Sequence, residues 1–86
     1  MIILTHKNFD RKYRKLRESE RKKFKERRNT FITDMFYPIL NNHALKGRHK
    51  GFRSINIGGD LRVIYKEISP GKVLFADIDN HNNLYK

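Results

Sequence analysis

Apolar positions along the chain follow two different periods, which divide the sequence into helical and β segments. Residues 1–6 (MIILTH) are apolar and β-branched and predict a short strand. Three later runs, at residues 52–57, 61–68 and 72–79, are rich in β-forming residues and largely alternate between apolar and polar side chains. A Gly-Gly pair separates the first two runs and Ser-Pro-Gly precedes the third, so these runs predict an antiparallel meander.

Apolar side chains at helical spacing follow the first strand. Phe9, Tyr13 and Leu16 obey the i, i+4, i+7 rule and predict a helix with one narrow apolar stripe. Asn8 is expected to cap this helix, which would begin at Phe9. His6, at the end of the first strand, is expected to be a capping or surface residue.

A second helix is expected from about residue 20 to residue 37, with Ser19 as its cap. Pro38 is expected to end or bend this helix, because proline lacks the backbone N–H that a helix needs. Residues 38–50 then predict an ordered loop that starts with a turn of helix. The apolar stripe of the second helix consists of Phe24, Phe31, Ile32, Met35 and Phe36.

The element order β-α-α-β-β-β predicts a single α+β domain over residues 1–86. The two helices form an antiparallel hairpin that covers one face of a small, mainly antiparallel sheet, because their stripes have no other apolar surface to bury. The opposite face mixes apolar and polar side chains, so we expect it to form a semi-polar groove. Residues 52–57 alternate between the two faces, with Arg53, Ile55 and Ile57 on one and Phe52, Ser54 and Asn56 on the other.

The charge of the chain points to a polyanionic partner. Twenty Lys and Arg against nine Asp and Glu give a formal net charge of +11, and the pI is near 10.3. Residues 7–28 hold 12 of the basic and four of the acidic side chains, so the helical hairpin has a basic outer face. A field of this sign attracts nucleic acid, which we favour over a merely solubilising role for the lysines.

Size and composition exclude several other classes of protein. The chain has no cysteine, so it forms neither disulfides nor thiolate metal sites. The apolar run near the N-terminus is too short for a signal peptide or a membrane span, and we expect a cytoplasmic protein. A chain of this size buries only about 60–65% of its unfolded surface, so its margin of stability is thin.

Side chains suited to chemistry lie mainly in the β half. Cleavage of RNA without a metal or cofactor needs a base for the 2′-hydroxyl, an acid for the leaving 5′-oxygen and a cation beside the phosphate. Histidine suits both proton transfers, and arginine suits the phosphate. His49 lies between Arg48 and Lys50 and is expected to contact phosphate or solvent. No metal site is expected, because His43 and His49 stand six residues apart without a carboxylate cluster.

Two segments resemble the RelE/ParE superfamily of bacterial toxin–antitoxin systems, and most closely its YafQ-like branch. They are HALKGRHKGFRSINIGGDLRVIY at residues 43–65 and ADIDNHNNLY at residues 76–85. In that branch an H-x-L-x-G segment leads through K-G-[YF]-R to a strand that opens with Asp, and G-T-H-x-x-L-[YF] closes the chain. The likeness covers about half of the protein, and the predicted element order agrees with the family fold.

The resemblance implies a ribosome-dependent mRNA endonuclease that cleaves by attack of the 2′-hydroxyl without a metal. By position, His43, Asp60 and His81 match catalytic residues of the YafQ-like branch, with His81 as the proton donor. Arg62 matches an arginine that RelE-type members use on the phosphate, and Tyr85 matches a tail aromatic that stacks on a base. The residues themselves leave open which histidine is the base and which is the acid.

The resemblance also implies partners. We expect a cognate acidic antitoxin to cover the groove near Arg62 and the basic helices to contact rRNA through phosphates. Further contacts with RNA are expected from Lys46, Arg48, His49, Lys50, Arg53 and Asn56.

The sequence departs from the YafQ-like pattern at three places. Asn56 stands where these toxins have another histidine, and Leu61 replaces a tryptophan. The tail reads DNH, ending in His81, where the family has GTH. Cleavage is therefore expected to be slower or differently selective, and to depend more on Arg62.

Two other functions stay open at the level of the sequence. One is ParE-like inhibition of DNA gyrase without nuclease activity, in which His43 and His81 are incidental. The other is a noncatalytic RNA-binding module, in which Arg53, Arg62 and the lysines hold RNA.

Overall fold

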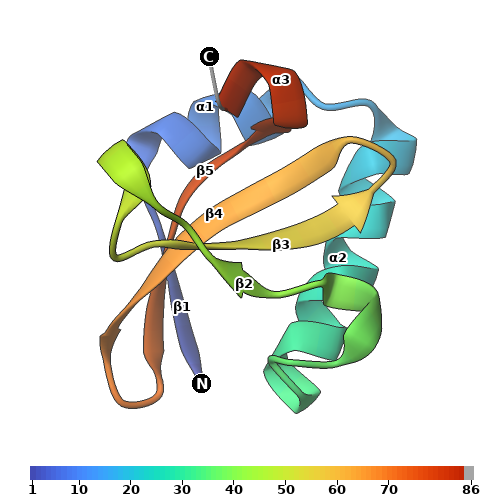
Figure 1. Ribbon diagram of the computed structural model, residues 1–86. Helices are drawn as coiled ribbons and strands as arrows, with labels where there is room; N and C mark the ends of the chain where they lie inside the picture. The colour runs from blue at the N-terminus through green and yellow to red at the C-terminus, as the bar shows by residue number, and fades with distance from the viewer. Residues whose placement is uncertain (85–86) are drawn as a thin grey trace.

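The computed structural model describes residues 1–84 and consists of one five-stranded sheet with helices packed against one of its faces (Figure 1). The predicted α+β class and the β-α-α-β-β-β order are confirmed, with a short strand and a short helix added. No helix in this part of the chain is long and apolar enough to cross a membrane. The elements are β1 (Ile2–Thr5), α1 (Lys7–Arg14), α2 (Glu18–Thr33), the 3₁₀ turn η1 (Pro38–Leu40), β2 (His43–Ala44), the 3₁₀ turn η2 (Gly47–His49), β3 (Arg53–Gly58), β4 (Leu61–Ser69), β5 (Lys72–Asn80) and α3 (His81–Leu84).

The strands lie in the order β1-β5-β4-β3-β2. β3, β4 and β5 form the predicted antiparallel meander. β1 lies parallel to β5, with Ile2 opposite Lys72, so the sheet is mixed. β2 is a two-residue strand that pairs with β3 inside the segment predicted to be a loop.

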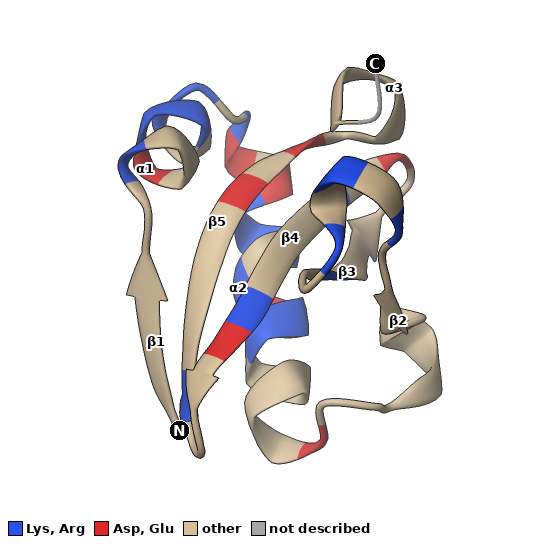
Figure 2. Cartoon of the chain, turned by 60° about the vertical axis from the view of Figure 1, so that its left-hand side comes forward, with Lys and Arg blue, Asp and Glu red and all other residues tan. Residues whose placement is uncertain are grey.

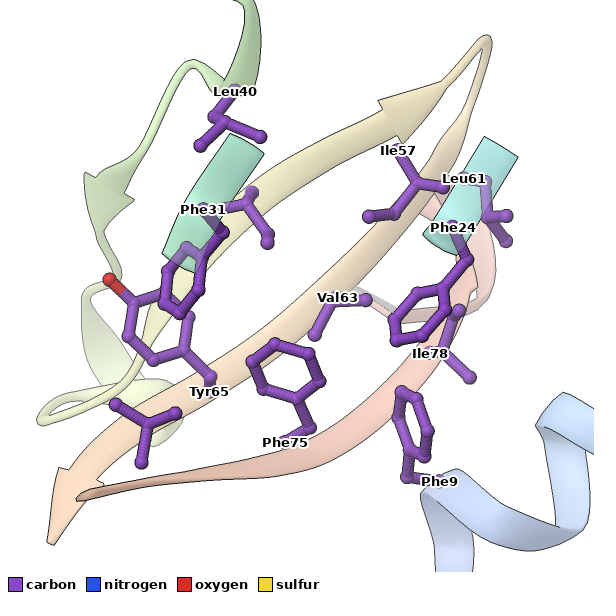
Figure 3. Close-up of a cluster of buried hydrophobic side chains, with 12 residues drawn as sticks. Phe9, Phe24, Phe31, Leu40, Ile57, Leu61, Val63, Tyr65, Phe75 and Ile78 are labelled. Carbon is purple, nitrogen blue, oxygen red and sulfur yellow. The ribbon is translucent and has the colours of Figure 1, made fainter. Parts of the chain in front are cut away.

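Aromatic rings join the helices to the sheet (Figure 3). The ring of Phe75 on β5 lies 5.8 Å from Phe9 of α1, 6.0 Å from Phe24 and 5.6 Å from Phe31 of α2, measured between centroids. Phe31 also meets Tyr65 of β4 edge to face at 4.9 Å. Full burial of such a ring stabilises the fold by roughly 1.5–3 kcal/mol relative to exposure. Because these rings come from four elements, one cluster fixes the helices against the sheet.

Strand alternation separates this core from the opposite face. Ile55 and Ile57 of β3 and Val63 and Tyr65 of β4 are fully buried in the core cluster. Ile64, only 4% exposed, is buried outside that cluster, on the face away from the helices. We call this side the open face; its residues on β3, β4 and β5 include Ser54, Asn56, Arg62, Ile64, Lys66, Asp77 and Asp79.

The second helix occupies different residues from those predicted. It ends at Thr33, because the chain turns extended at Asp34, whose Oδ1 accepts a hydrogen bond from the backbone N–H of Phe36 at 3.0 Å. Ile32 and Phe36 were predicted on the buried stripe, but they are 45% and 61% exposed. The predicted turn of helix near Pro38 is present as η1.

The helix caps also differ from the prediction. His6, and not Asn8, caps α1: its Nδ1 accepts a hydrogen bond from the backbone N–H of Asn8 at 3.0 Å. α2 begins after Arg17 and not after Ser19. The carboxylate of Glu20 accepts the backbone N–H of Arg17 at 3.0 Å, and this bond lowers the pKa of Glu20.

Replacing Phe31 with leucine should show how strongly the aromatic cluster supports the fold. We expect the free energy of unfolding to fall by about 1–2 kcal/mol, since the core loses its ring packing while keeping an apolar side chain. Urea denaturation measures this loss. Phe36→Leu is the matched control on the surface and should change stability by less than about 0.5 kcal/mol; equal losses would contradict the assignment.

Candidate functional site

Polar side chains gather where the open face meets the β3–β4 turn and the start of α3. Asn56 is paired with Arg62 across β3 and β4, and Arg62 with Asp79 across β4 and β5, so the three form one row on one face. In the turn, the backbone oxygen of Asp60 accepts the backbone N–H of His81 at 2.8 Å. The structure thus brings the backbones of Asp60 and His81 to the turn against which the side chain of Arg62 is held, so three of the predicted catalytic residues lie in this region.

Arg62 is held against the β3–β4 turn. Its Nη1 donates hydrogen bonds to the backbone oxygens of Gly59 at 2.7 Å and Leu61 at 3.2 Å. A guanidinium has five N–H donors in a planar fork, so these two bonds from one nitrogen do not exhaust it. The side chain is half-buried. Because a guanidinium is always charged, Arg62 places a permanent positive charge at this end of the open face.

His43 lies on the same face but at some distance from this group. It is paired with Ser54 across β2 and β3, so two strand spacings and two residues along the strand separate it from Arg62. Regular strand geometry makes this roughly 12 Å between Cα atoms. A phosphodiester can therefore lie between His43 and Arg62, whereas the two side chains do not act as a contacting pair.

Hydrogen bonding sets the chemical role that the imidazole of His43 can take. Its Nδ1 lies 2.8 Å from the backbone oxygen of Asn41. A carbonyl oxygen only accepts hydrogen bonds, so the proton of the neutral ring is on Nδ1 and the lone pair is on Nε2. This is the tautomer of a general base.

Two buried polar atoms lie between His43 and Arg62 in the strand register. Within the described residues, Ser54 Oγ and Asn56 Oδ1 have no hydrogen-bond partner. Buried polar atoms are nearly always paired, so these two are exceptions, and both are closed to solvent beneath the open face. Sequence analysis did not single out Ser54, although strand alternation had placed it on the same face as Asn56.

An ion-pair cluster fastens the start of α3 to β5 and α1. Lys12 Nζ lies 3.0 Å from Asp77 Oδ1 and 3.2 Å from Asp79 Oδ2. The other oxygen of Asp79 accepts the backbone N–H of Asn80 at 2.8 Å and the side-chain amide of Asn83 at 3.1 Å. This cluster positions the helix that begins with the candidate proton donor. Sequence analysis missed it, although both aspartates alternate onto the face of Arg62.

The contacts within this ion-pair cluster shift the pKa values of Asp79 and Lys12. Burial alone would raise the pKa of Asp79, but hydrogen bonds from Asn83, Asn80 and Lys12 outweigh it and lower that pKa. Burial alone would lower the pKa of Lys12, but the hydrogen bonds to Asp77 and Asp79 raise it. Both groups are therefore held in their charged forms.

The predicted RNA-contacting residues fall into separate places. Lys46, Arg48 and Lys50 are exposed around η2, a segment that lies in front of the open face (Figure 2). His49, in the same turn, lines a groove of that face. Asn56 lies on the open face itself, in the polar row.

Arg53 does not join them. It extends toward the helix side, where its Nε donates to Asn42 Oδ1 at 2.7 Å and its guanidinium lies 5.2 Å from the ring centroid of Phe36. Tyr85 lies outside the described residues. No group of three or more His, Asp or Glu side chains in residues 1–84 is arranged to hold a metal ion.

Comparison with known proteins identifies the fold. No family model and no curated protein sequence matches the chain. Among solved structures, YafQ from E. coli strain BL21(DE3) superposes with a TM-score of 0.77 at 21% identity, covering 98% of this chain and 97% of YafQ. A YoeB/ParE toxin from Agrobacterium tumefaciens gives 0.78 at 16% identity, covering 94% and 99%.

This protein has the fold of the RelE-like toxins. The resemblance inferred from the two sequence segments is thus confirmed at the level of the fold. A structure of the YoeB–YefM toxin–antitoxin complex from Staphylococcus aureus also matches, with a TM-score of 0.76 at 18% identity over 94% of this chain and 97% of that one.

Substituting Asp79 with alanine tests the ion-pair cluster. We expect a loss of about 1–2 kcal/mol in the free energy of unfolding at pH 7, because a partly buried carboxylate with several hydrogen bonds is removed. The pKa of Asp79 is lowered in the folded state, so its contribution is present above about pH 4 and is lost as the pH falls through the folded value.

Urea unfolding at pH 7, 5 and 3 measures this dependence. The gap in stability between the wild type and Asp79→Ala should shrink at pH 3. Glu67→Gln, at an exposed position of β4, is the control and should differ little from the wild type. A gap that stays constant down to pH 3 would exclude a charged role for Asp79.

Proposed function

We propose that this protein is the toxin of a type II toxin–antitoxin system and cleaves mRNA on the ribosome by metal-independent attack of the 2′-hydroxyl. One observation carries the proposal. Asp60, Arg62 and His81, from the β3–β4 hairpin and from α3, meet at one end of a sheet face that also holds His43. The shared fold with YafQ and YoeB supports the same function.

The chemistry follows from the positions of these groups. Nε2 of His43 takes the proton of the 2′-hydroxyl, and the 2′-oxygen attacks phosphorus. The guanidinium of Arg62 faces the non-bridging oxygens, where negative charge gathers. His81 gives a proton to the departing 5′-oxygen. The products are a 2′,3′-cyclic phosphate and a 5′-hydroxyl, so protons and bonds balance without water.

Neighbouring groups support this arrangement. Asn56, which is partly exposed between His43 and Arg62, contacts the ribose. Asp60 holds the start of α3 through its backbone oxygen, and Asp79 holds it through Asn80 and Asn83. Reliance on the 2′-hydroxyl restricts the reaction to RNA.

The basic residues outside the candidate site serve to bind rRNA and an antitoxin. Exposed Lys and Arg side chains of α1 and α2 contact rRNA phosphates, which fix orientation without reading sequence; they include Arg11, Arg14, Lys22 and Lys25. The same positive charge attracts an acidic antitoxin, which would cover the open face near Arg62 and block the site.

Removing the proton donor or the phosphate contact should abolish cleavage in cells. We expect His81→Ala to reduce message cleavage by roughly 10²–10⁴-fold and Arg62→Gln by roughly 10²–10³-fold. Mapping of mRNA ends on translating ribosomes after induction measures this. Lys72→Gln removes a charge at the far end of β5 and is the control, with cleavage expected near the wild-type level.

Other results of that experiment would support a different function. DNA breaks without message cuts would indicate inhibition of gyrase, as a ParE-like toxin would produce. Neither kind of damage, with RNA still bound, would indicate a noncatalytic RNA-binding module. Cuts that persist in His81→Ala would remove this histidine from the mechanism.

Ribosome binding should depend on salt through the basic helices. The double variant Lys22→Gln, Lys25→Gln removes two exposed charges of α2. We expect weaker binding and a slope of log affinity against log salt that is shallower by about 0.7 for each phosphate that the variant no longer neutralises. Co-sedimentation with ribosomes at several salt concentrations gives the slope, and an unchanged slope would place the interaction with rRNA elsewhere.

A further inference from the structure

The open face contains a groove of about 290 Å³ that the cleavage mechanism does not use. Its floor is apolar and includes Ile64 of β4 and Leu74 of β5. Ile64 is only 4% exposed although it is not part of the main core cluster, so the walls of the groove already shield it from water. An apolar floor on the side of the sheet away from the core needs a separate explanation.

The walls of the groove carry aromatic and imidazole rings. His49 at the end of η2 and Phe52 just after it line one part of the groove, and His6, at the junction of β1 and α1, also lines it. Lys66 Nζ lies 5.4 Å from the ring centroid of Phe52. The Nδ1 of His6 accepts the backbone N–H of Asn8, so the neutral ring carries its proton on Nε2 and can donate a hydrogen bond there.

The groove lies next to the candidate site. Ile64 follows Arg62 by two residues on β4 and points to the same face, a step of about 6.6 Å along the strand. Asp77 likewise lies two residues before Asp79 on β5 and lines the groove. A strand of RNA with one phosphate at Arg62 would thus place an adjacent nucleotide over this groove.

The side chains that line the groove favour a nucleobase as its ligand. A nucleobase has apolar faces that stack on an aromatic ring and polar edges that pair with donors, which matches a groove of this composition. Its volume of about 290 Å³ is just below the roughly 300–1,000 Å³ range of pockets for drug-sized ligands, which suits a single base. An apolar side chain of a protein partner would fit the floor but would leave the donor of His6 unpaired.

The surrounding charge favours the same occupant. Exposed Lys46, Arg48 and Lys50 stand around η2, beside Phe52, and can hold the phosphates on either side of the base.

We propose that this groove is a nucleobase subsite, in which Phe52 stacks on a base of the RNA adjacent to the scissile linkage. The subsite rests on the proposed function. It adds to that function one residue, Phe52, that determines which nucleotide lies beside the cut.

Fluorescence of 2-aminopurine, a base analogue quenched by stacking, tests the subsite. Single-stranded RNA pentamers, each with the analogue at one position, are titrated with the His81→Ala protein so that the strand stays intact. We expect quenching at one position on binding. Phe52→Leu keeps an apolar side chain in place but removes the ring, and should abolish that quenching and weaken binding by about 5- to 100-fold.

Two further variants separate stacking from folding. Phe52→Trp restores an aromatic face and should keep affinity for the RNA at or above that of the His81→Ala parent. Phe36→Leu removes an exposed ring on the other side of the sheet and should change neither quenching nor affinity. Circular dichroism of each variant establishes that it is folded.

The outcomes distinguish the subsite from the proposed function. RNA that binds with no position quenched, or equally well to Phe52→Leu, overturns the subsite alone. Failure to bind RNA, together with no cleavage in cells, overturns both. A Phe52→Leu variant that binds RNA normally but loses its antitoxin would assign the groove to the protein partner and also overturn the subsite.

Discussion

The structure depends on the burial of one aromatic cluster against a single face of the sheet. Phe75 of β5 contacts rings from α1 and α2, and Tyr65 of the neighbouring strand β4 meets Phe31 of α2. Because strand residues alternate, committing one set of side chains to this core leaves the other set on the open face. Asn56, Arg62 and Asp79 are aligned there as a consequence of that commitment. The helices stabilise the sheet from one side and leave the other face uncovered by them.

Much of this arrangement could be predicted because it follows from local patterns. The alternation in β3 and β4 puts Ile55 and Asn56 on opposite faces, and likewise Val63 and Arg62, as observed; the structure adds that Ile55 and Val63 are on the buried side. Helix boundaries were harder to predict from the sequence, because they depend on individual hydrogen bonds. The side chain of Asp34 ends α2 early by closing a turn, and nothing in the spacing of apolar residues reports that bond.

The candidate site was only partly predictable, because it is assembled by contacts between distant segments. His81 reaches Asp60 through a backbone hydrogen bond that no local pattern encodes. β2 has only two residues and exists because His43 and Ala44 find partners on β3. The ion pairs of Lys12 with Asp77 and Asp79 join residues more than sixty positions apart. Motif resemblance pointed to the candidate catalytic residues, whereas the groups that support them emerged only from the three-dimensional arrangement.

The parallel pairing of β1 with β5 affects when the protein can complete its folding. Ile2 is paired with Lys72, so the strand that is synthesised early finds its neighbour only when most of the described chain exists. Contacts of such long sequence separation are slow to form and cost loop entropy before they contribute any stability. During translation the sheet therefore stays incomplete at this edge until nearly all of the described residues have been synthesised.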